Sequence, residues 1–282
     1  MLPWIHPHLA QSVDPHKGRQ LQASATIRRG EVVLIDPPYA IIPTLSVDKT
    51  TLLCSNPQCN SPVPVSGATR HPKPESGQGA TCPNRCSSEV LWCHDVCRLT
   101  DKARHDFECT WLSRFARSIR SKWGEYNFGM LWLIVRLLAR RHTEHLHLLH
   151  HEKNIHPASP LNRFKANWPA MQSLCGTPDT WSNAQVREWT LLVRKYLSAA
   201  VLPHDLSNDA VLGLICQEEA NSFGLYPRET GVYPPPAPNP SVNRGDQFGA
   251  AVYPRASIAN HSCCPNVRIH PHSFPSKVLE GS

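Results

Sequence analysis

Two stretches of the chain decide its fold: CSNPQC at residues 54–59 and CPNRCSSEVLWCHDVCRLTDKARHDFEC at residues 82–109. They hold cysteine and histidine side chains in four close pairs, with gaps of four, three, three and three residues. Structural zinc takes four such ligands in a tetrahedron, and a close pair supplies two of them from one turn. We therefore predict a finger that folds around two closed, structural zinc sites. The eight predicted ligands are Cys54, Cys59, Cys82, Cys86, Cys93, Cys97, His105 and Cys109.

The composition is that of a globular protein, with 40% hydrophobic and 18% charged residues in 282. The longest apolar stretch, Phe128 to Val135, is far shorter than the ~20 residues of a membrane span, so we expect no membrane partner. The N-terminus MLPWIHPHLA has neither the basic nor the apolar region of a secretory signal. We expect a location in the cytoplasm and/or nucleus, where thiols stay reduced and cysteines bind metals.

The pattern of the remaining chain predicts an α+β fold. Residues 17–43 predict strands, with a β-branched run at 31–35, and short strands are expected at 249–253 and 266–270. From about residue 110 to 220 the apolar residues recur with a helical period. Ser182 is a predicted N-cap, and a further helix is expected from Asp209 to Glu219. The Pro-rich segments 60–80 and 233–240 predict loops.

The order of the zinc ligands resembles the MYND zinc finger, with Trp92 before Cys93 and the ending His105-x3-Cys109. That family interleaves its two sites. The resemblance implies one zinc held by Cys54, Cys59, Cys93 and Cys97, and the other by Cys82, Cys86, His105 and Cys109. The long loop after Cys59 and the four-residue gap in the first pair depart from the compact family pattern.

Three further motifs extend the resemblance: Lys17-Gly18-Arg19, Asn221-Ser222-Phe223-Gly224 and NHSCCPN at 260–266. With a MYND finger between the first two, they resemble the SET and MYND (SMYD-type) methyltransferases. The implied fold is a SET-domain β-fold split by the finger and by a helical insert. The implied divisions are SET strands at 1–53, the finger at 54–109, the helical insert at 110–205 and the SET core at 206–282.

The resemblance implies transfer of a methyl group from S-adenosylmethionine to a lysine of a protein substrate. The implied cofactor-binding residues are Gly18, Arg19, Asn221, Asn260 and His261. The family has Gly-x-Gly in the N-terminal loop, whereas this chain has Gln20 at the last position. A side chain there crowds a ligand that a glycine would admit.

Two family features that follow the signature are expected to be missing: a catalytic tyrosine and a Cys-x-Cys-x2-Cys cluster that binds a third zinc. No tyrosine follows Tyr253 and no cysteine follows Cys264, so Cys263 would be a third-zinc ligand without its partners. We therefore assign no catalytic residue and expect a truncated chain, inactive by itself. The alternative function is a non-catalytic zinc-finger module that binds a partner peptide.

Two further clusters of residues have less specific interpretations. Arg114, Arg117, Arg120 and Lys122 lie together with no acid among them, which suits either weak nucleic-acid contact or a solvated helix face. The histidines 142, 145, 147, 150 and 151 crowd one helix end, where the dipole favours positive charge, and we favour this over a metal site. Cys175 and Cys216 are expected in the core.

Overall fold

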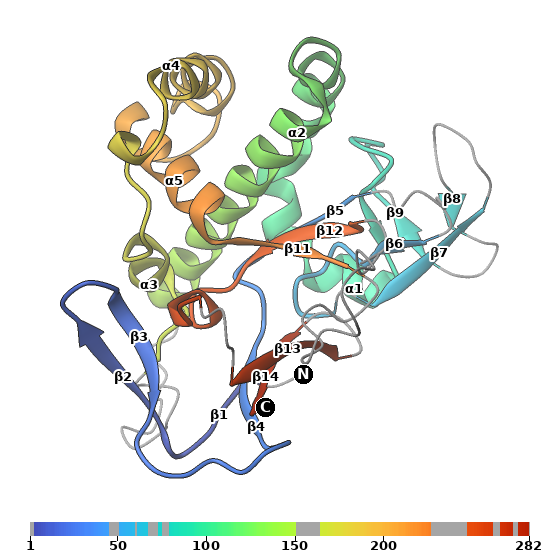
Figure 1. Cartoon of the computed structure of the whole chain (residues 1–282). Helices are drawn as coiled ribbons and strands as arrows, with labels where there is room; N and C mark the ends of the chain where they lie inside the picture. Colours follow the sequence, from blue (N-terminus) through green and yellow to red (C-terminus); the bar gives the residue numbers. More distant parts are fainter. Residues whose placement is uncertain are drawn as a thin grey trace, which may run out of the picture.

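The structure is a computed structural model of the chain. It describes residues 3–44, 51–59, 61–66, 73–74, 79–150, 164–226, 247–261, 266–272 and 276–281. Strands from both ends of the sequence combine with a group of helices from the middle of the sequence, as predicted for an α+β fold (Figure 1). The helices α2 (Lys102–His150), α4 (Asn183–Leu192) and α5 (Asn208–Asn221) lie together, and the finger lies to one side of α2. The hairpin of β2 (Leu9–Asp14) and β3 (Gly18–Ala23) projects at the opposite side of the view.

Two sheets join segments that are far apart in the sequence. One has the order β11-β12-β5 and the other β1-β4-β14-β13, with antiparallel pairing throughout. The first sheet consists of β5 (Ala40–Pro43), β11 (Ser222–Leu225) and β12 (Gly249–Val252). The second consists of β1 (Trp4–Ile5), β4 (Val32–Asp36), β13 (Val267–His272) and β14 (Ser276–Gly281). The strands expected at 249–253 and 266–270 are present, whereas β14 was not predicted.

The finger is built from short strands and one short helix. The strands are β6 (Thr51–Leu53), β7 (Pro62–Ser66), β8 (Lys73–Pro74), β9 (Ala80–Thr81) and β10 (Leu91–Trp92). The helix is α1 (Asp95–Thr100), whose N-cap His94 accepts a hydrogen bond from the main-chain N–H of Cys97. Such short elements bury little apolar surface, so a finger of this kind depends on other cross-links for its stability.

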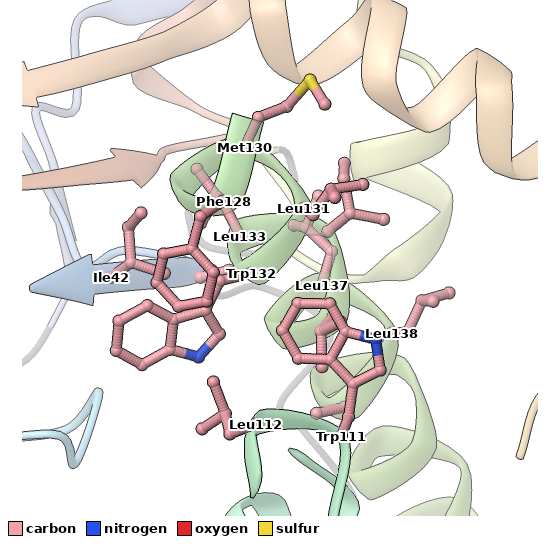
Figure 2. Close-up of a cluster of buried hydrophobic side chains, with 14 of the residues drawn as sticks. Ile42, Trp111, Leu112, Phe128, Met130, Leu131, Trp132, Leu133, Leu137 and Leu138 are labelled. Atoms are coloured by element: carbon pink, nitrogen blue, oxygen red, sulfur yellow. The ribbon is translucent and has the colours of Figure 1, made fainter. Parts of the chain in front are cut away.

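The long helix α2 (Lys102–His150) starts earlier than the sequence predicted, because its first turns belong to the finger. Gly124 interrupts it with φ 82° and ψ 172°, a backbone conformation that residues with a Cβ rarely adopt. Beyond this break, α2 packs its apolar side chains against Trp111 and against Ile42 of β5 (Figure 2). The helix therefore links the finger to the central sheet.

The other helices begin at the residues that local sequence rules favour. Ser182 accepts a hydrogen bond from Gln185 N–H and caps α4 (Asn183–Leu192), as predicted. Ser207 caps α5 (Asn208–Asn221) in the same way, and Asn167 caps α3 (Trp168–Gln172). Within the described residues, no helix is long and apolar enough to cross a membrane.

Several expectations made from the sequence are corrected or lie outside the described residues. Cys216 is buried as expected, but Cys175 is exposed, so its assignment to the core was wrong. The basic cluster is smaller than predicted, because Arg120 pairs with Glu89 and Glu125. Cys263, segment 233–240 and His151 lie outside the described residues, as do the side chains of histidines 147 and 150.

Candidate zinc centres and cofactor region

The eight predicted zinc ligands come together in two groups of four, with the ligand atoms of each group within 4.8 Å of one another. The first group, which we call the Cys54 centre, has its residues after β6, after β10 and in α1. Its Sγ atoms lie 3.6 Å apart between Cys59 and Cys93, and 3.5 Å apart between Cys93 and Cys97. Its members are Cys54, Cys59, Cys93 and Cys97.

The second group, which we call the His105 centre, is buried at all four residues. Nε2 of His105 lies 3.2 Å from Cys82 Sγ and 3.7 Å from Cys86 Sγ. The Sγ atoms of Cys82 and Cys109 are 3.6 Å apart. Because His105 and Cys109 are one turn apart on α2, the long helix supplies half of this centre.

Both groups have the chemistry and dimensions of structural zinc sites. Zinc–sulfur bonds of about 2.3 Å in a tetrahedron place neighbouring sulfur atoms about 3.7 Å apart, close to the observed distances. Four cysteines, or three cysteines with one histidine, are common structural donor sets, and four protein ligands leave no open position for catalysis. The two groups are those that the resemblance to MYND fingers implies, and they fit two structural zinc ions.

Local backbone geometry explains how the close pairs form. In the Cys82–Cys86 pair, Arg85 N–H donates to the carbonyl of Cys82, and Arg85 has φ 49°. In the Cys54–Cys59 pair, Cys59 N–H donates to the carbonyl of Asn56. Each turn folds the chain back within a few residues, so that both sulfur atoms of a pair face the same point.

The thiol of Cys82 is already biased toward the thiolate that zinc requires. Burial raises the pKa of Cys82, but the hydrogen bond from Cys86 N–H and the close contact with His105 outweigh it and lower the pKa to about 7. A thiolate near neutral pH is the form that binds zinc. The protein therefore favours metal binding at this position by its own hydrogen bonds.

Three of the five candidate cofactor residues, Gly18, Arg19 and Asn260, lie at the hairpin formed by β2 (Leu9–Asp14) and β3 (Gly18–Ala23). Gly18 begins β3 with φ 70°, and Asp14 accepts hydrogen bonds from the main chain across the turn. The side chain of Asn260 donates to the carbonyl of Arg19 at 3.2 Å, across 241 residues of sequence. The structure therefore brings the N-terminal loop motif and the C-terminal signature together.

Asn221 lies at the C-terminal end of α5, and its amide is bonded to the main chain. It donates to the carbonyls of Cys175 at 2.6 Å and Gln217 at 2.7 Å. Its own carbonyl accepts a bond from Ser257 Oγ at 3.4 Å, just before the signature. Asn221 is thus tied to the segment that leads to Asn260, while its side chain holds the loop after α3. His261 is exposed.

A cavity of about 350 Å³ lies beside this hairpin, within the size range of small-molecule sites. Of the five predicted cofactor residues, Arg19 lines it, and its guanidinium donates to Ser173 at the end of α3. Most of the lining was missed by sequence reasoning, because these residues form no motif. The lining consists of Gln11, Arg19, Phe164, Lys165, Asn167, Pro169, Ala170, Pro254 and Ile258.

A buried ion pair fixes two walls of the cavity. Asp36, at the end of β4, is fully buried and accepts bonds from Arg255 Nη1 at 2.9 Å and from the N–H groups of Arg255 and Ala256. Arg255 Nε also donates to the carbonyl of Phe164 at 2.6 Å. Burial raises the pKa of Asp36, and Arg255 opposes this only in part. The pair therefore holds the segment before Asn260 against Phe164.

Glu218, a buried acid in α5, should make the stability of the fold depend on pH. Glu218 is 4% exposed, and its Oε2 has no hydrogen-bond partner among the described residues. Burial, with a smaller contribution from Glu219, raises its pKa from 4.5 to about 8. Between pH 4.5 and about 8, the carboxyl group of Glu218 keeps its proton in the folded chain but has released it in the unfolded chain. The free energy of unfolding therefore falls as pH rises, by about 1.4 kcal/mol per pH unit at most.

We expect Glu218→Gln to remove this part of the pH dependence, because an amide does not ionise. Chemical denaturation at several pH values from about 6 to about 8.5, the range that ends just above the raised pKa, would measure the difference between wild type and variant. Asp179→Asn, at an exposed carboxylate, is the matched control and should keep the wild-type slope. Parallel slopes for wild type and Glu218→Gln would contradict the prediction.

Apart from the two centres, the described residues contain no group of three or more Cys, His, Asp or Glu side chains close enough to hold a metal. His142 and His145 are exposed and belong to neither group. His142 instead lies with its ring 5.4 Å from that of Phe107. Tyr253, the last tyrosine of the chain, is fully buried against Phe223.

Comparison with known proteins finds a distant relative whose family agrees with the two Cys/His centres. No family model matches the chain. The chain is 22% identical over 261 residues to the N-lysine methyltransferase SMYD2-B of Danio rerio. The match covers 93% of this chain and 48% of the relative, so the chain spans about half the length of the relative it matches. This distant similarity and the two Cys/His centres agree with a resemblance to SMYD-type lysine methyltransferases.

Proposed function

We propose that the chain provides the zinc finger and the cofactor-binding part of an S-adenosylmethionine-dependent protein-lysine methyltransferase. The observation that carries the proposal is the bond from Asn260 to the Arg19 carbonyl beside the cavity. It joins the two motifs that the resemblance assigns to the cofactor, although they lie at opposite ends of the sequence. The distant similarity to a lysine methyltransferase supports the same assignment.

The residues around the cavity have chemistry that fits this cofactor. Arg19 and Lys165 bring positive charge to the lining, which suits the carboxylate of an amino-acid ligand. Gly18, Asn260, His261 and Asn221 are the other residues that we propose to hold it. The cofactor, when bound, supplies a sulfonium methyl group for a neutral lysine amine. The protein's contribution is to position the two groups and to exclude water.

Titration calorimetry of the zinc-loaded chain with S-adenosylmethionine tests the proposal. We expect saturable binding that Asn260→Ala weakens about tenfold, because losing one hydrogen bond that fixes the loop costs about 1.4 kcal/mol. Gln22→Ala, at an exposed position of β3, is the control and should bind like wild type. The absence of binding heat, or equal affinity of Asn260→Ala and wild type, would overturn the proposal.

A non-catalytic interaction module is the second candidate, and exposed apolar residues favour it. Val96 and Leu99, three residues apart on α1, are 65% and 60% exposed at the surface of the finger and are available to a partner peptide. Titration with S-adenosylmethionine separates the two candidates. Saturable binding of the cofactor favours the methyltransferase part, whereas its absence leaves the interaction module as the function of this chain.

Weak nucleic-acid contact through the basic part of α2 is a further proposal. Arg114, Arg117 and Lys122 are exposed, but Arg120 is neutralised by its acidic partners. Three cations on one helix support only weak binding that falls steeply with salt.

A further inference from the structure

The His105 centre is connected to the rest of the protein through one carboxylate. Glu108 is fully buried on α2, one turn beyond His105. Its Oε1 lies 3.1 Å from His105 Nδ1, and Arg104 forms an ion pair with the same oxygen at 2.9 Å. Since Nε2 of His105 faces the sulfur atoms of Cys82 and Cys86, Glu108 contacts the ring nitrogen that points away from the metal position.

The other oxygen of Glu108 connects the centre to the central sheet. Its Oε2 accepts hydrogen bonds from Trp132 Nε1 at 2.8 Å and from Arg136 Nε at 2.9 Å. Arg136 is also buried, and its Nη1 donates to the carbonyl of Ile41 in β5. A chain of direct contacts therefore runs from a zinc ligand to a strand of the β11-β12-β5 sheet.

The Cys54 centre has a different environment. Cys59 and Cys93 are only partly buried, and the side-chain bonds around this centre stay within the finger. Asn56, for example, donates to Thr100 Oγ1 at 2.9 Å. Arg104 Nη2 donates to the carbonyl of Ser55, next to Cys54, at 3.3 Å, but no described contact joins a ligand of this centre to Glu108 itself. The two centres thus differ in how they are joined to the rest of the fold.

From these contacts we propose that Glu108 positions the zinc ligand His105 and couples metal binding at this centre to strand β5. Its carboxylate holds the proton of His105 on Nδ1, which leaves the Nε2 lone pair directed at the metal. Arg104 and Arg136 both form ion pairs with this buried carboxylate, at 2.9 Å each. The same carboxylate that orients the ligand also holds Arg136 against β5. Loss of zinc from the His105 centre therefore loosens β5 more than loss from the Cys54 centre, which reaches Glu108 only through Ser55 and Arg104. This proposal does not depend on the proposed methyltransferase function.

The first test measures zinc affinity centre by centre in the full chain. Chelator competition resolves the two metals when cobalt replaces zinc, because the absorption bands of cobalt differ between a site of four thiolates and one of three thiolates with an imidazole. We expect Glu108→Gln to weaken the His105 centre by about 10- to 100-fold, as removal of such partners of metal ligands does. The affinity of the Cys54 centre should stay at the wild-type value. Equal weakening of both centres, or no weakening of either, would overturn the positioning role.

The second test keeps Glu108 and so remains informative if Glu108→Gln fails to fold. Hydrogen exchange of the β5 and β12 amides is followed while a chelator removes zinc stepwise. In wild type we expect protection of the amides at 40–42 to fall when the His105 centre releases zinc. In Arg136→Met, protection there should no longer depend on that release, because the link to Ile41 is gone. The coupling would be refuted if protection of β5 in wild type did not change on zinc release. It would also be refuted if the change were equally large in Arg136→Met.

Discussion

Replacing Cys86 by alanine is expected to unfold the finger, whereas the same change at Cys175 leaves stability nearly unchanged. Cys86 is a buried member of the His105 centre, and Cys175 is exposed and belongs to neither centre. Structural zinc binding supplies about 10–16 kcal/mol in isolated fingers, so removing one of four ligands costs several kcal/mol. That loss is comparable with the whole stability of an ordinary domain, about 5–15 kcal/mol.

Two measurements check this expectation. Metal analysis should find two zinc ions per chain in wild type and in Cys175→Ala, and fewer in Cys86→Ala. Thermal unfolding should show a large loss of stability for Cys86→Ala and almost none for Cys175→Ala. Cys93→Ala, in the less buried Cys54 centre, should also lose metal and stability. Equal melting temperatures for the variants at 86 and 175, or a wild-type zinc content near zero or one, would contradict the assignment.

Asp36→Ala is expected to destabilise the protein by about 3–5 kcal/mol, the usual cost of breaking a buried ion pair from one side. It leaves the guanidinium of Arg255 buried without its carboxylate, and two main-chain N–H groups lose their acceptor. Because Arg255 also holds Phe164, the cavity wall should loosen, and binding of the proposed cofactor should weaken with it.

An exposed ion pair supplies the matched control for Asp36→Ala. Asp95 pairs with Arg98 on α1 at 2.9 Å, but the Asp95 side chain is 72% exposed. Asp95→Ala should cost less than about 1 kcal/mol, because water screens such pairs. Denaturant unfolding of both variants measures the contrast. Similar losses for the two would show that the Asp36–Arg255 pair contributes no more than a surface contact.

Much of the finger could be predicted from the sequence because its determinants are local. Two ligands of a zinc site that are separated by three or four residues meet in one turn, whatever the rest of the chain does. The N-cap Ser182 and the strands around 249–253 were predictable for the same reason, since caps and β-branched runs act over a few residues. The grouping of the ligands into two sets came from the resemblance, since four pairs can be combined in more than one way.

Contacts between distant parts of the sequence were decided by the tertiary structure alone. Asp36 and Arg255 are 219 residues apart, and no pattern in the sequence predicts that they form an ion pair. Glu108 has the sequence position of an ordinary helical acid; only packing shows that it is buried between His105 and Arg136. The cavity lining and the exposure of Cys175 were likewise invisible, because burial depends on which elements pack together. The sequence by itself determined where metal ligands, caps and strands occur, while the fold decided which charges are buried and paired. The physical reason is range: turn and capping geometry act within a few residues, whereas burial and charge pairing act between elements that only folding brings together.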